Sequence, residues 1–286
     1  MANTITNYLS LVKFSHTIFA LPFALIGFTL AVAWADAGFD WLLLVYVVLC
    51  MVFARSAAMA FNRYIDRDID KDNERTAVRE IPAGVIAPKA ALTFVVVNCL
   101  AFIGVTWLIN PICFFLSPVA LLVVLGYSLT KRFTFLCHLV LGLGLSLAPI
   151  GAYLAVTGVF DWMPLFFSFA VLFWVSGFDI IYALQDEAFD KSHALHSIPV
   201  RLGKQNSLRL STVFHVITAG FIVAAGVYAS LGILYWVGAT VFIALLAYQH
   251  TLVKPNDLSR VNLAFFTTNG IASVVFAVFV ILDLLF

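Results

Sequence analysis

Apolar residues fill most of the chain and fall into nine long runs, which are separated by short polar segments. A helix that spans a membrane needs roughly 20 mostly apolar residues, and each run is close to that length. The nine expected helices cover residues 17–35, 41–61, 91–109, 111–129, 136–157, 163–184, 211–231, 233–250 and 263–285. This pattern predicts an all-α polytopic membrane protein with one transmembrane domain formed by residues 1–286.

The composition excludes most other classes of protein. Of the 286 residues, 63% are hydrophobic and only 11% are charged, whereas soluble domains average about half apolar and a quarter charged residues. The four cysteines lie within or beside apolar runs and lack the spacing of a zinc site or a disulfide framework. The basic residues lie in or beside the loops between the apolar runs, where they serve to orient the protein in the membrane, so nucleic-acid binding is not expected.

The distribution of charge predicts the orientation in the membrane. When the loops are taken in order, every Lys and Arg falls at the same end of the expected helices, and the opposite end carries only acids. These acids are Asp36, Asp40, Asp161 and Asp283. Because cytoplasmic loops are enriched in Lys and Arg, we expect an inner (cytoplasmic) membrane protein with a cytoplasmic N-terminus and an external C-terminus.

Both long polar loops, residues 62–90 and 185–210, begin with polar residues at helical spacing. Residues three or four apart on a helix share one face. The first row consists of Asn62, Asp66 and Asp70, and the second of Asp179, Tyr182, Asp186 and Asp190. Like charges at this spacing destabilise a helix by roughly 0.2–0.5 kcal/mol per pair. Two such rows, each at the end of an expected span, therefore indicate a bound cation at the cytoplasmic side.

The residue types in the rows favour magnesium. Oxygen ligands without a neighbouring Cys or His suit Mg²⁺ better than zinc, and Mg²⁺ commonly joins one or two carboxylates to a phosphate. Facing rows would hold a metal-bound diphosphate, and the position of Asp179 at membrane depth favours a functional site. Alternatively, each row is a solvated face at the lipid headgroups, neutralised by basic neighbours. Those neighbours are Arg67, Lys71 and Arg75.

Basic residues could complete a diphosphate site. Lys131 and Arg132 are adjacent in an expected cytoplasmic turn, and Arg75 and Arg79 follow the first acidic row. The planar guanidinium group of Arg can bind two phosphate oxygens at once. The same four residues also act as topology signals, so this pattern alone leaves both interpretations open.

Four segments match signatures of one protein family. Asn62, Asp66 and Asp70 match N-D-x-x-D-x-x-x-D, and residues 75–84, with Arg75 and Arg79, are similar to R-T-x-x-R-P-[IL]-P-[SA]-G. Tyr182, Asp186 and Asp190 match Y-x-x-x-D-x-x-x-D, and residues 127–134 match Y-x-x-x-K-R-[FY]-T. The chain thus resembles the UbiA family of intramembrane aromatic prenyltransferases, in a branch similar to 4-hydroxybenzoate polyprenyltransferases. Arg63 departs from the family pattern, because Asp is usual there, and this bears on the aromatic substrate more than on the reaction.

The resemblance implies nine helices around a central cavity with both acidic motifs at its cytoplasmic mouth. It implies Mg²⁺ on the diphosphate of a polyprenyl donor, held by Asp66, Asp70, Asp186 and Asp190. It also implies diphosphate contacts from Asn62, Lys131, Arg132, Arg75 and Arg79. The acceptor would be an aromatic acid, 4-hydroxybenzoate or a dihydroxynaphthoate of ubiquinone or menaquinone biosynthesis. Asp179 or Tyr182 would orient that acid or take its proton.

An ion-coupled or proton-coupled transporter is the main alternative, because intramembrane acids can relay protons. Against it, the acidic rows lie at one side of the membrane and the other side has few ionisable groups. A CDP-alcohol phosphotransferase also uses Asp rows with Mg²⁺, but its D-G-x-x-A-R run is missing from the sequence. A purely structural membrane protein explains neither row.

Overall fold

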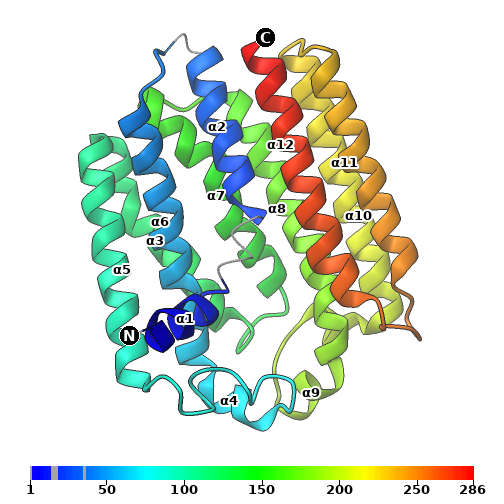
Figure 1. Cartoon of the computed structure of the whole chain (residues 1–286). Coiled ribbons are helices and arrows are strands. Elements are labelled where there is room, and N and C mark those ends of the chain that lie inside the picture. The colour runs from blue at the N-terminus through cyan, green and yellow to red at the C-terminus, as the bar shows by residue number, and fades with distance from the viewer. Residues whose placement is uncertain (1, 14–18, 35–36) are drawn as a thin grey trace.

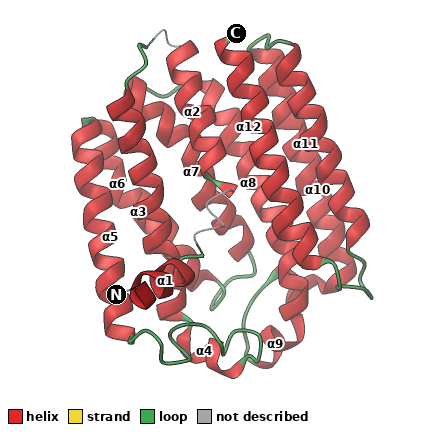
Figure 2. Ribbon diagram, viewed as in Figure 1, coloured by secondary structure: helices red, strands yellow, loops and turns green. Residues whose placement is uncertain are grey.

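The computed structural model describes residues 2–13, 19–34 and 37–286, and the regular elements in these ranges are helices (Figures 1 and 2). They are α1 (Ala2–Leu11), α2 (Leu21–Trp34), α3 (Trp41–Ile65), α4 (Arg67–Asp72), α5 (Pro88–Ile109), α6 (Pro111–Thr130), α7 (Cys137–Thr157), α8 (Trp162–Ala183), η2 (Leu184–Asp186), α9 (Glu187–Ser192), α10 (Ile198–Tyr228), α11 (Ile233–Leu252), η3 (Leu263–Thr268) and α12 (Asn269–Leu285). The long helices form a bundle, and the short helices α4 and α9 lie together at one end of it (Figure 1).

The expected membrane helices are present. Eight spans in the described residues are long and apolar enough to cross a membrane, namely α3, α5, α6, α7, α8 with η2 and α9, α10, α11, and η3 with α12. The span expected at 17–35 corresponds to the shorter apolar helix α2, and residues 17, 18 and 35 lie outside the described residues. The prediction of an all-α integral membrane protein is confirmed.

One expected boundary was wrong. The span predicted at 211–231 begins at Ile198, so most of the segment 185–210, expected to be a polar loop, is helical. Gly203 interrupts the regular geometry of α10 with a φ of 73°, in the left-handed region that favours glycine. The polar residues Lys204, Gln205, Asn206 and Arg209 follow this bend. They interrupt the apolar run, which is why hydropathy alone did not extend the predicted span to Ile198.

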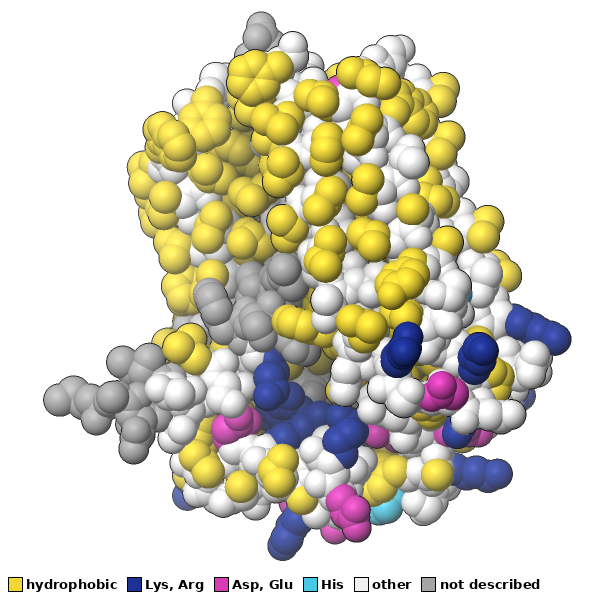
Figure 3. Space-filling model, turned by 45° about the vertical axis from the view of Figure 1, so that its right-hand side comes forward, with side chains coloured by type: hydrophobic (Ala, Val, Ile, Leu, Met, Phe, Trp, Pro, Cys, Tyr) yellow, Lys and Arg dark blue, Asp and Glu magenta, His cyan; other side chains and the backbone are white. Residues whose placement is uncertain are grey.

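Charged side chains gather at the end of the bundle that carries α4 and α9, and hydrophobic side chains cover the face above it (Figure 3). At the opposite end, Asp40 accepts hydrogen bonds from the backbone N–H of Leu42, and Asp161 accepts from that of Met163, both at 2.8 Å. Asp283 accepts from the N–H of Gly232 at 2.7 Å. These three acids therefore cap helix N-termini, while Asp36 lies outside the described residues.

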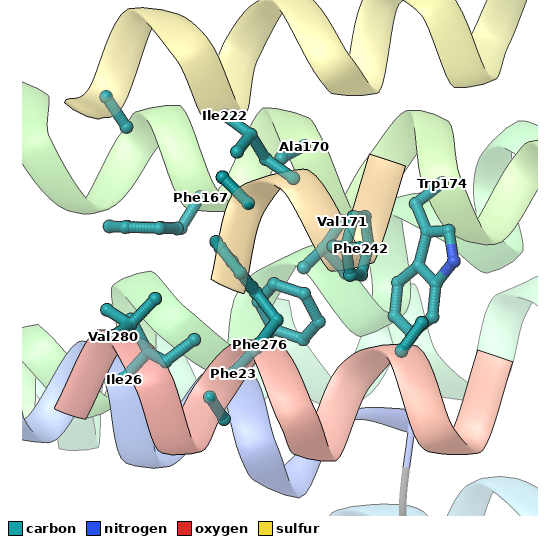
Figure 4. Packing of buried hydrophobic residues seen from close by; sticks show 14 of the residues in the cluster. Phe23, Ile26, Phe167, Ala170, Val171, Trp174, Ile222, Phe242, Phe276 and Val280 are labelled. Carbon is teal, nitrogen blue, oxygen red and sulfur yellow. The ribbon is translucent and has the colours of Figure 1, made fainter. Parts of the chain in front are cut away.

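Helix α8 packs against both α7 and α10, and its Ala170, Val171 and Trp174 belong to the main hydrophobic cluster (Figure 4). Its Trp174 is fully buried and packs against Phe23 of α2 and Phe242 of α11, with ring centroids 5.3 and 5.5 Å away. Gly142 lets α7 approach α8 closely, because a Cβ atom there would collide with the Leu172 carbonyl oxygen. This close contact positions the α7 side chains that face α8.

A buried hydrogen-bond network fixes the start of α12. The indole N–H of Trp174 donates to the Asn269 side chain at 2.8 Å, and the Asn269 amide donates to Gln249 at 3.2 Å. The same amide donates to the backbone carbonyl of Phe265 at 2.9 Å. Because Phe265 belongs to the π-helical segment η3, whose carbonyls lack ordinary helical partners, the network holds this segment in place.

Candidate functional site

A cavity of about 1030 Å³ opens at the charged end of the bundle. All the residues that the sequence predicted to act in catalysis, metal binding or diphosphate binding contribute to its wall. They are Asn62, Asp66, Asp70, Arg75, Arg79, Lys131, Arg132, Asp179, Tyr182, Asp186 and Asp190. The fold therefore brings together residues from four separate segments of the chain, which the sequence could only group by motif.

The first acidic row follows the junction between α3 and α4. Asn62 lies in the last turn of α3, Asp66 at the junction, and Asp70 in α4. The Asn62 amide donates to Asp66 Oδ2 at 3.0 Å, and the Asp70 backbone N–H donates to the Asp66 carbonyl at 2.7 Å. The four-residue spacing thus continues across the break in the helix and keeps these side chains on the cavity wall.

The second row descends from α8 into the short helices that follow it. Asp179 and Tyr182 lie on α8, Asp186 ends η2, and Asp190 lies in α9. Asp190 is fully buried, whereas the Asp186 side chain is 15% exposed. Asp179 is seven residues before Asp186, which places it deeper in the bundle by roughly 10 Å.

Each of the four motif carboxylates lies in an ion pair. Asp66 pairs with Arg132 at 3.0 Å, Asp70 with Arg79 at 2.6 Å, Asp186 with Arg75 at 2.7 Å, and Asp190 with Lys131 at 2.6 Å. The alternative, in which Arg67, Lys71 and Arg75 neutralise solvated rows, agrees with the structure only for Arg75, which pairs with the second row. Arg67 instead lies 3.5 Å from the exposed Asp68.

These ion pairs connect the two rows across the cavity. Lys131 and Arg132 are consecutive, yet Lys131 binds the second row and Arg132 the first. Arg75 follows the first row in sequence but reaches Asp186 with two nitrogens and the Tyr182 hydroxyl at 3.1 Å. The two rows therefore face one another, with cations between them.

The electrostatics of the site favour an additional positive charge. Burial raises the pKa of Asp66 above its usual range, and the neighbouring Asp70 carboxylate raises it further, although Arg132 acts in the opposite direction. Burial alone would lower the pKa of Lys131, but the Asp190 carboxylate outweighs this effect and the pKa is raised. Repulsion between Asp66 and Asp70 is thus only partly offset in this arrangement, and a divalent cation would relieve it.

The donor atoms fit Mg²⁺ as a bridging ion. Within the described ranges, no three His, Cys, Asp or Glu side chains stand close enough to enclose a metal by themselves. The carboxylates lie instead in two facing rows, each next to basic residues. Mg²⁺ commonly takes one or two carboxylates and completes its shell with water and phosphate oxygens. This arrangement suits a metal that arrives with a diphosphate, and it does not suit a closed protein site.

His138 is a site residue that the sequence interpretation missed. It lies near the start of α7, lines the cavity, and is 3% exposed. Its Nδ1 atom lies 2.7 Å from Asp179 Oδ2. No motif contains it, and only the close packing of α7 on α8 reveals the contact.

The sequence patterns did not place the two arginines of α3 in the site. They indicated a topology signal for Arg55, and for Arg63 a departure from the family pattern. Arg55 lies ten residues before the end of α3 at Ile65, so it is about 15 Å from the charged end of that helix. Arg55 and Arg63 both line the cavity, and the Nε atom of each is buried without a hydrogen-bond partner among the described residues. The sequence signal for Arg55 was a charge inside an apolar span.

An apolar cavity of about 390 Å³ adjoins the charged one between α3, α6 and α7. Residues shared by both walls mark the junction. They are Arg55, Met59, Tyr127, Leu141 and Leu145. The two cavities together offer a polar region at the end of the bundle and an apolar region inside it, with Arg55 between them.

Aromatic rings line another part of the charged cavity. Tyr182 stacks on Phe265 with ring centroids 4.2 Å apart, and Phe178 packs edge-on against Phe265 at 5.4 Å. All three residues contribute to the cavity wall. The sequence could not identify them among 28 phenylalanines, since the π-helical segment η3 is what directs Phe265 towards the site.

Comparison with known proteins gives a consistent result over nearly the whole chain. The model of the UbiA prenyltransferase family matches residues 20–271. A 4-hydroxybenzoate octaprenyltransferase of Nitrosomonas europaea is 31% identical over 252 residues, which are 88% of this chain and 86% of that protein.

Solved structures share the fold. The apo structure of a UbiA homolog from Aeropyrum pernix K1 has a TM-score of 0.85 and 30% identity, covering 94% of this chain and 98% of that one. A UbiA homolog from Archaeoglobus fulgidus bound to GPP and Mg²⁺ has a TM-score of 0.76 and 22% identity, covering 97% of this chain and 99% of that one. The chain therefore belongs to the UbiA prenyltransferase family, whose members are membrane-embedded transferases of prenyl groups.

Proposed function

We propose that this enzyme transfers a polyprenyl group from a polyprenyl diphosphate to 4-hydroxybenzoate or a dihydroxynaphthoate in quinone biosynthesis, with Mg²⁺ as cofactor. The observation that carries this proposal is the pair of facing carboxylate rows, tied together by basic residues, in a cavity that adjoins an apolar one. The names of the relatives support the hydroxybenzoate acceptor, and the ligands of the Archaeoglobus fulgidus homolog support a prenyl diphosphate with Mg²⁺.

The diphosphate would bind between the two rows at the cytoplasmic side of the inner membrane. Asp66, Asp70, Asp186 and Asp190 would hold Mg²⁺, which when bound stabilises the negative charge that develops on the leaving diphosphate. The basic residues now paired with these carboxylates would turn to the diphosphate oxygens, with Asn62 beside them. These basic residues are Arg75, Arg79, Lys131 and Arg132.

The apolar part of the donor needs no polar partner, and the adjoining apolar cavity offers a place for it. As the allylic C–O bond breaks, positive charge develops on the prenyl carbon. The aromatic faces of Tyr182, Phe178 and Phe265 would stabilise this charge. They would also keep water away from a carbon that would otherwise react with it.

Arg55 would bind the carboxylate of the aromatic acceptor. Its guanidinium group is the deepest cation described in the cavity wall, at the junction with the apolar cavity, and its Nε lacks a partner there. A buried, unpaired charge is costly, whereas an acceptor acid would pair with it. The ring would then lie between Arg55 and the diphosphate site, where an electron-rich ring carbon can attack the prenyl carbon.

A transporter is less consistent with the described acids. Asp40, Asp161 and Asp283, which would have to form the external part of a polar path, are occupied as helix caps. Cap residues that hold backbone N–H groups are poorly suited to bind or pass on an ion.

The proposal is tested with the purified protein in liposomes, a labelled polyprenyl diphosphate, MgCl₂ and either aromatic acid. We expect a lipid-soluble prenylated acid together with released diphosphate, and no product when EDTA removes the metal. Addition of excess MgCl₂ after EDTA should restore the rate. Release of diphosphate without a prenylated product, or full activity in EDTA, would contradict the proposal.

Arg132→Ala should chiefly weaken use of the donor. A hydrogen bond to a charged group contributes about 1.5–3 kcal/mol, so the KM for the prenyl diphosphate should rise roughly 10- to 100-fold. The KM for the aromatic acid should stay within about twofold. Arg67→Ala is the matched control, since Arg67 lies at the same end of the bundle but outside the cavity wall. Equal effects of both variants would argue against a specific role for Arg132.

A further inference from the structure

The pair formed by His138 and Asp179 joins two helices at the wall of the charged cavity. Nδ1 of His138 and Oδ2 of Asp179 are 2.7 Å apart. The imidazole is almost completely buried, at 3% exposure, while the Asp179 side chain is 22% exposed. The carboxylate is thus fixed from one side and accessible from the cavity on the other.

The surroundings of His138 determine how the pair is protonated. The backbone N–H of Ile198 points at His138 Nε2, with 3.4 Å between the nitrogens. An N–H can only donate, so Nε2 accepts and the ring proton of a neutral imidazole lies on Nδ1. Nδ1–H then donates to Asp179 Oδ2, and this hydrogen bond fixes the orientation of the carboxylate.

Further contacts hold the backbone of His138 in place from outside the cavity. The Ser176 hydroxyl lies between two backbone carbonyls, 2.7 Å from that of Leu172 and 3.1 Å from that of His138. Gly142, one turn further along α7, allows the close approach to α8. His138 is therefore immobilised before any substrate binds, as positioned catalytic groups require.

The second oxygen of Asp179 is available to a substrate. In the part of the chain that the structure describes, no hydrogen bond is recorded to Oδ1 of Asp179, whereas Tyr182 is engaged. The Tyr182 hydroxyl accepts from Arg75 at 3.1 Å, and its ring stacks on Phe265. Of the two α8 residues that could take a proton from the acceptor, Asp179 is the one that is both fixed and accessible.

The depth of Asp179 matches the position of the acceptor. It lies about 10 Å deeper than Asp186 along α8 and η2, between the diphosphate site and the level of Arg55. It is also outside the set of four carboxylates assigned to the metal. A hydroxyl on the aromatic ring could reach Asp179 while the ring carboxylate binds Arg55.

We propose that Asp179 is the base that takes the hydroxyl proton of the aromatic acceptor, and that His138 is the positioning residue that holds Asp179 in its reactive orientation. The proposal rests on the aromatic prenyl transfer proposed above. As the hydroxyl proton moves to Asp179 Oδ1, the ring carbon beside the hydroxyl forms the new C–C bond. The allylic C–O bond breaks, and diphosphate leaves with the electron pair.

The proton balance closes without another reactant. The ring carbon that forms the C–C bond then loses its hydrogen to water, and aromaticity returns. The oxygen regains the proton that Asp179 held. One proton is released per prenyl group transferred, and Asp179 ends as the carboxylate with which it started.

The experiment compares His138→Leu with His138→Asn, in full-length protein reconstituted in liposomes. The asparagine amide can place a donor near the position of Nδ1, whereas leucine cannot. We expect His138→Leu to lower kcat at least 10-fold with an unchanged donor KM, and His138→Asn to retain most of the rate. Ser176→Ala, which removes the contact behind His138 without changing its side chain, should stay within about threefold of the wild type.

A series of acceptors separates this role from a merely structural one. 3-Fluoro-4-hydroxybenzoate has a more acidic hydroxyl than 4-hydroxybenzoate and depends less on a base. The factor by which His138→Leu lowers kcat, relative to the wild type on the same acid, should therefore be several-fold smaller for the fluorinated acid. An equal loss on both acids, or equal loss in the Asn and Leu variants, would overturn the proposal.

A double-mutant cycle completes the test. Asp179→Asn should lower kcat by about 100-fold or more, and adding His138→Leu to it should cost little further, because His138 acts through Asp179. If His138→Leu cannot be purified, Asp179→Asn decides alone, and wild-type turnover of 4-hydroxybenzoate by it overturns the proposal. Failure of the wild type to prenylate any hydroxylated acid would instead contradict the proposed function.

Discussion

Asp186→Asn and Asp66→Asn should each reduce prenyl transfer by on the order of 1000-fold while the protein still inserts and folds. Asparagine has nearly the same size as aspartate but lacks the charge that binds Mg²⁺ and opposes the basic residues. Removal of one preorganised electrostatic contact at a reacting centre typically costs 10²- to 10³-fold in kcat, and a metal ligand also contributes to cofactor binding. The rate of product formation at saturating donor and MgCl₂ measures the effect.

The control for these variants is Asp68→Asn. Asp68 lies in α4 between the two carboxylates of the first row, but its side chain is 85% exposed and contacts only Arg67 among the recorded ion pairs of the described residues. All three substitutions change the net charge by the same amount. A drop in the rate of prenyl transfer that occurs only in the Asp66→Asn and Asp186→Asn variants is therefore specific to the cavity. A thermal unfolding midpoint close to the wild type would separate lost chemistry from lost folding. Wild-type-like turnover by either variant would contradict the site assignment.

The acidic rows could be predicted because local sequence rules determine them. Asn62, Asp66 and Asp70 keep helical spacing across the break between α3 and α4, since the Asp70 N–H still bonds to the Asp66 carbonyl. The charge pattern also predicted that all these residues share one end of the bundle. Periodicity is a property of a few neighbouring residues, and charge segregation follows from the order of spans and loops along the chain, so neither requires the tertiary structure.

The partners of those carboxylates could not be predicted in the same way. Proximity in sequence offered Arg67, Lys71 and Arg75 as the alternative partners of the rows, but Arg132, more than sixty residues away, pairs with Asp66. The contact between His138 and Asp179 likewise depends on the close approach of α7 to α8 at Gly142. Such long-range contacts follow from helix packing, and a single sequence does not determine how helices pack.

Arg55 shows how one observation can be read in two ways. As a basic residue near the end of an apolar run, Arg55 agreed with the enrichment of Lys and Arg on the cytoplasmic side. That agreement was a sufficient explanation for the residue at the level of the sequence. The structure places it about 15 Å from the end of α3, at the junction of two cavities. A cation at that depth is not needed to orient the helix, so it requires another explanation.

Arg55→Leu should lower kcat/KM for the aromatic acid on the order of 100- to 1000-fold, because loss of one partner of a buried charge pair costs about 2–5 kcal/mol. The donor KM should change by less than about twofold. Phenol, which lacks the carboxylate, should react equally slowly with the wild type and the variant. Steady-state kinetics with 4-hydroxybenzoate and with phenol measure both effects.

Stability gives an independent check on Arg55. Since its Nε has no partner among the described residues, replacing the side chain with leucine removes a buried charge and leaves no described partner unpaired. The thermal unfolding midpoint should therefore stay the same or rise, while use of the acid falls. Arg55→Lys, which keeps the charge but not the planar guanidinium, should retain part of the activity. If Arg55 serves acceptor binding, its buried charge should lower the stability of the protein and its loss should slow only the reaction of the acid. A variant that loses stability and also loses activity towards both acceptors would therefore show that Arg55 has a structural role.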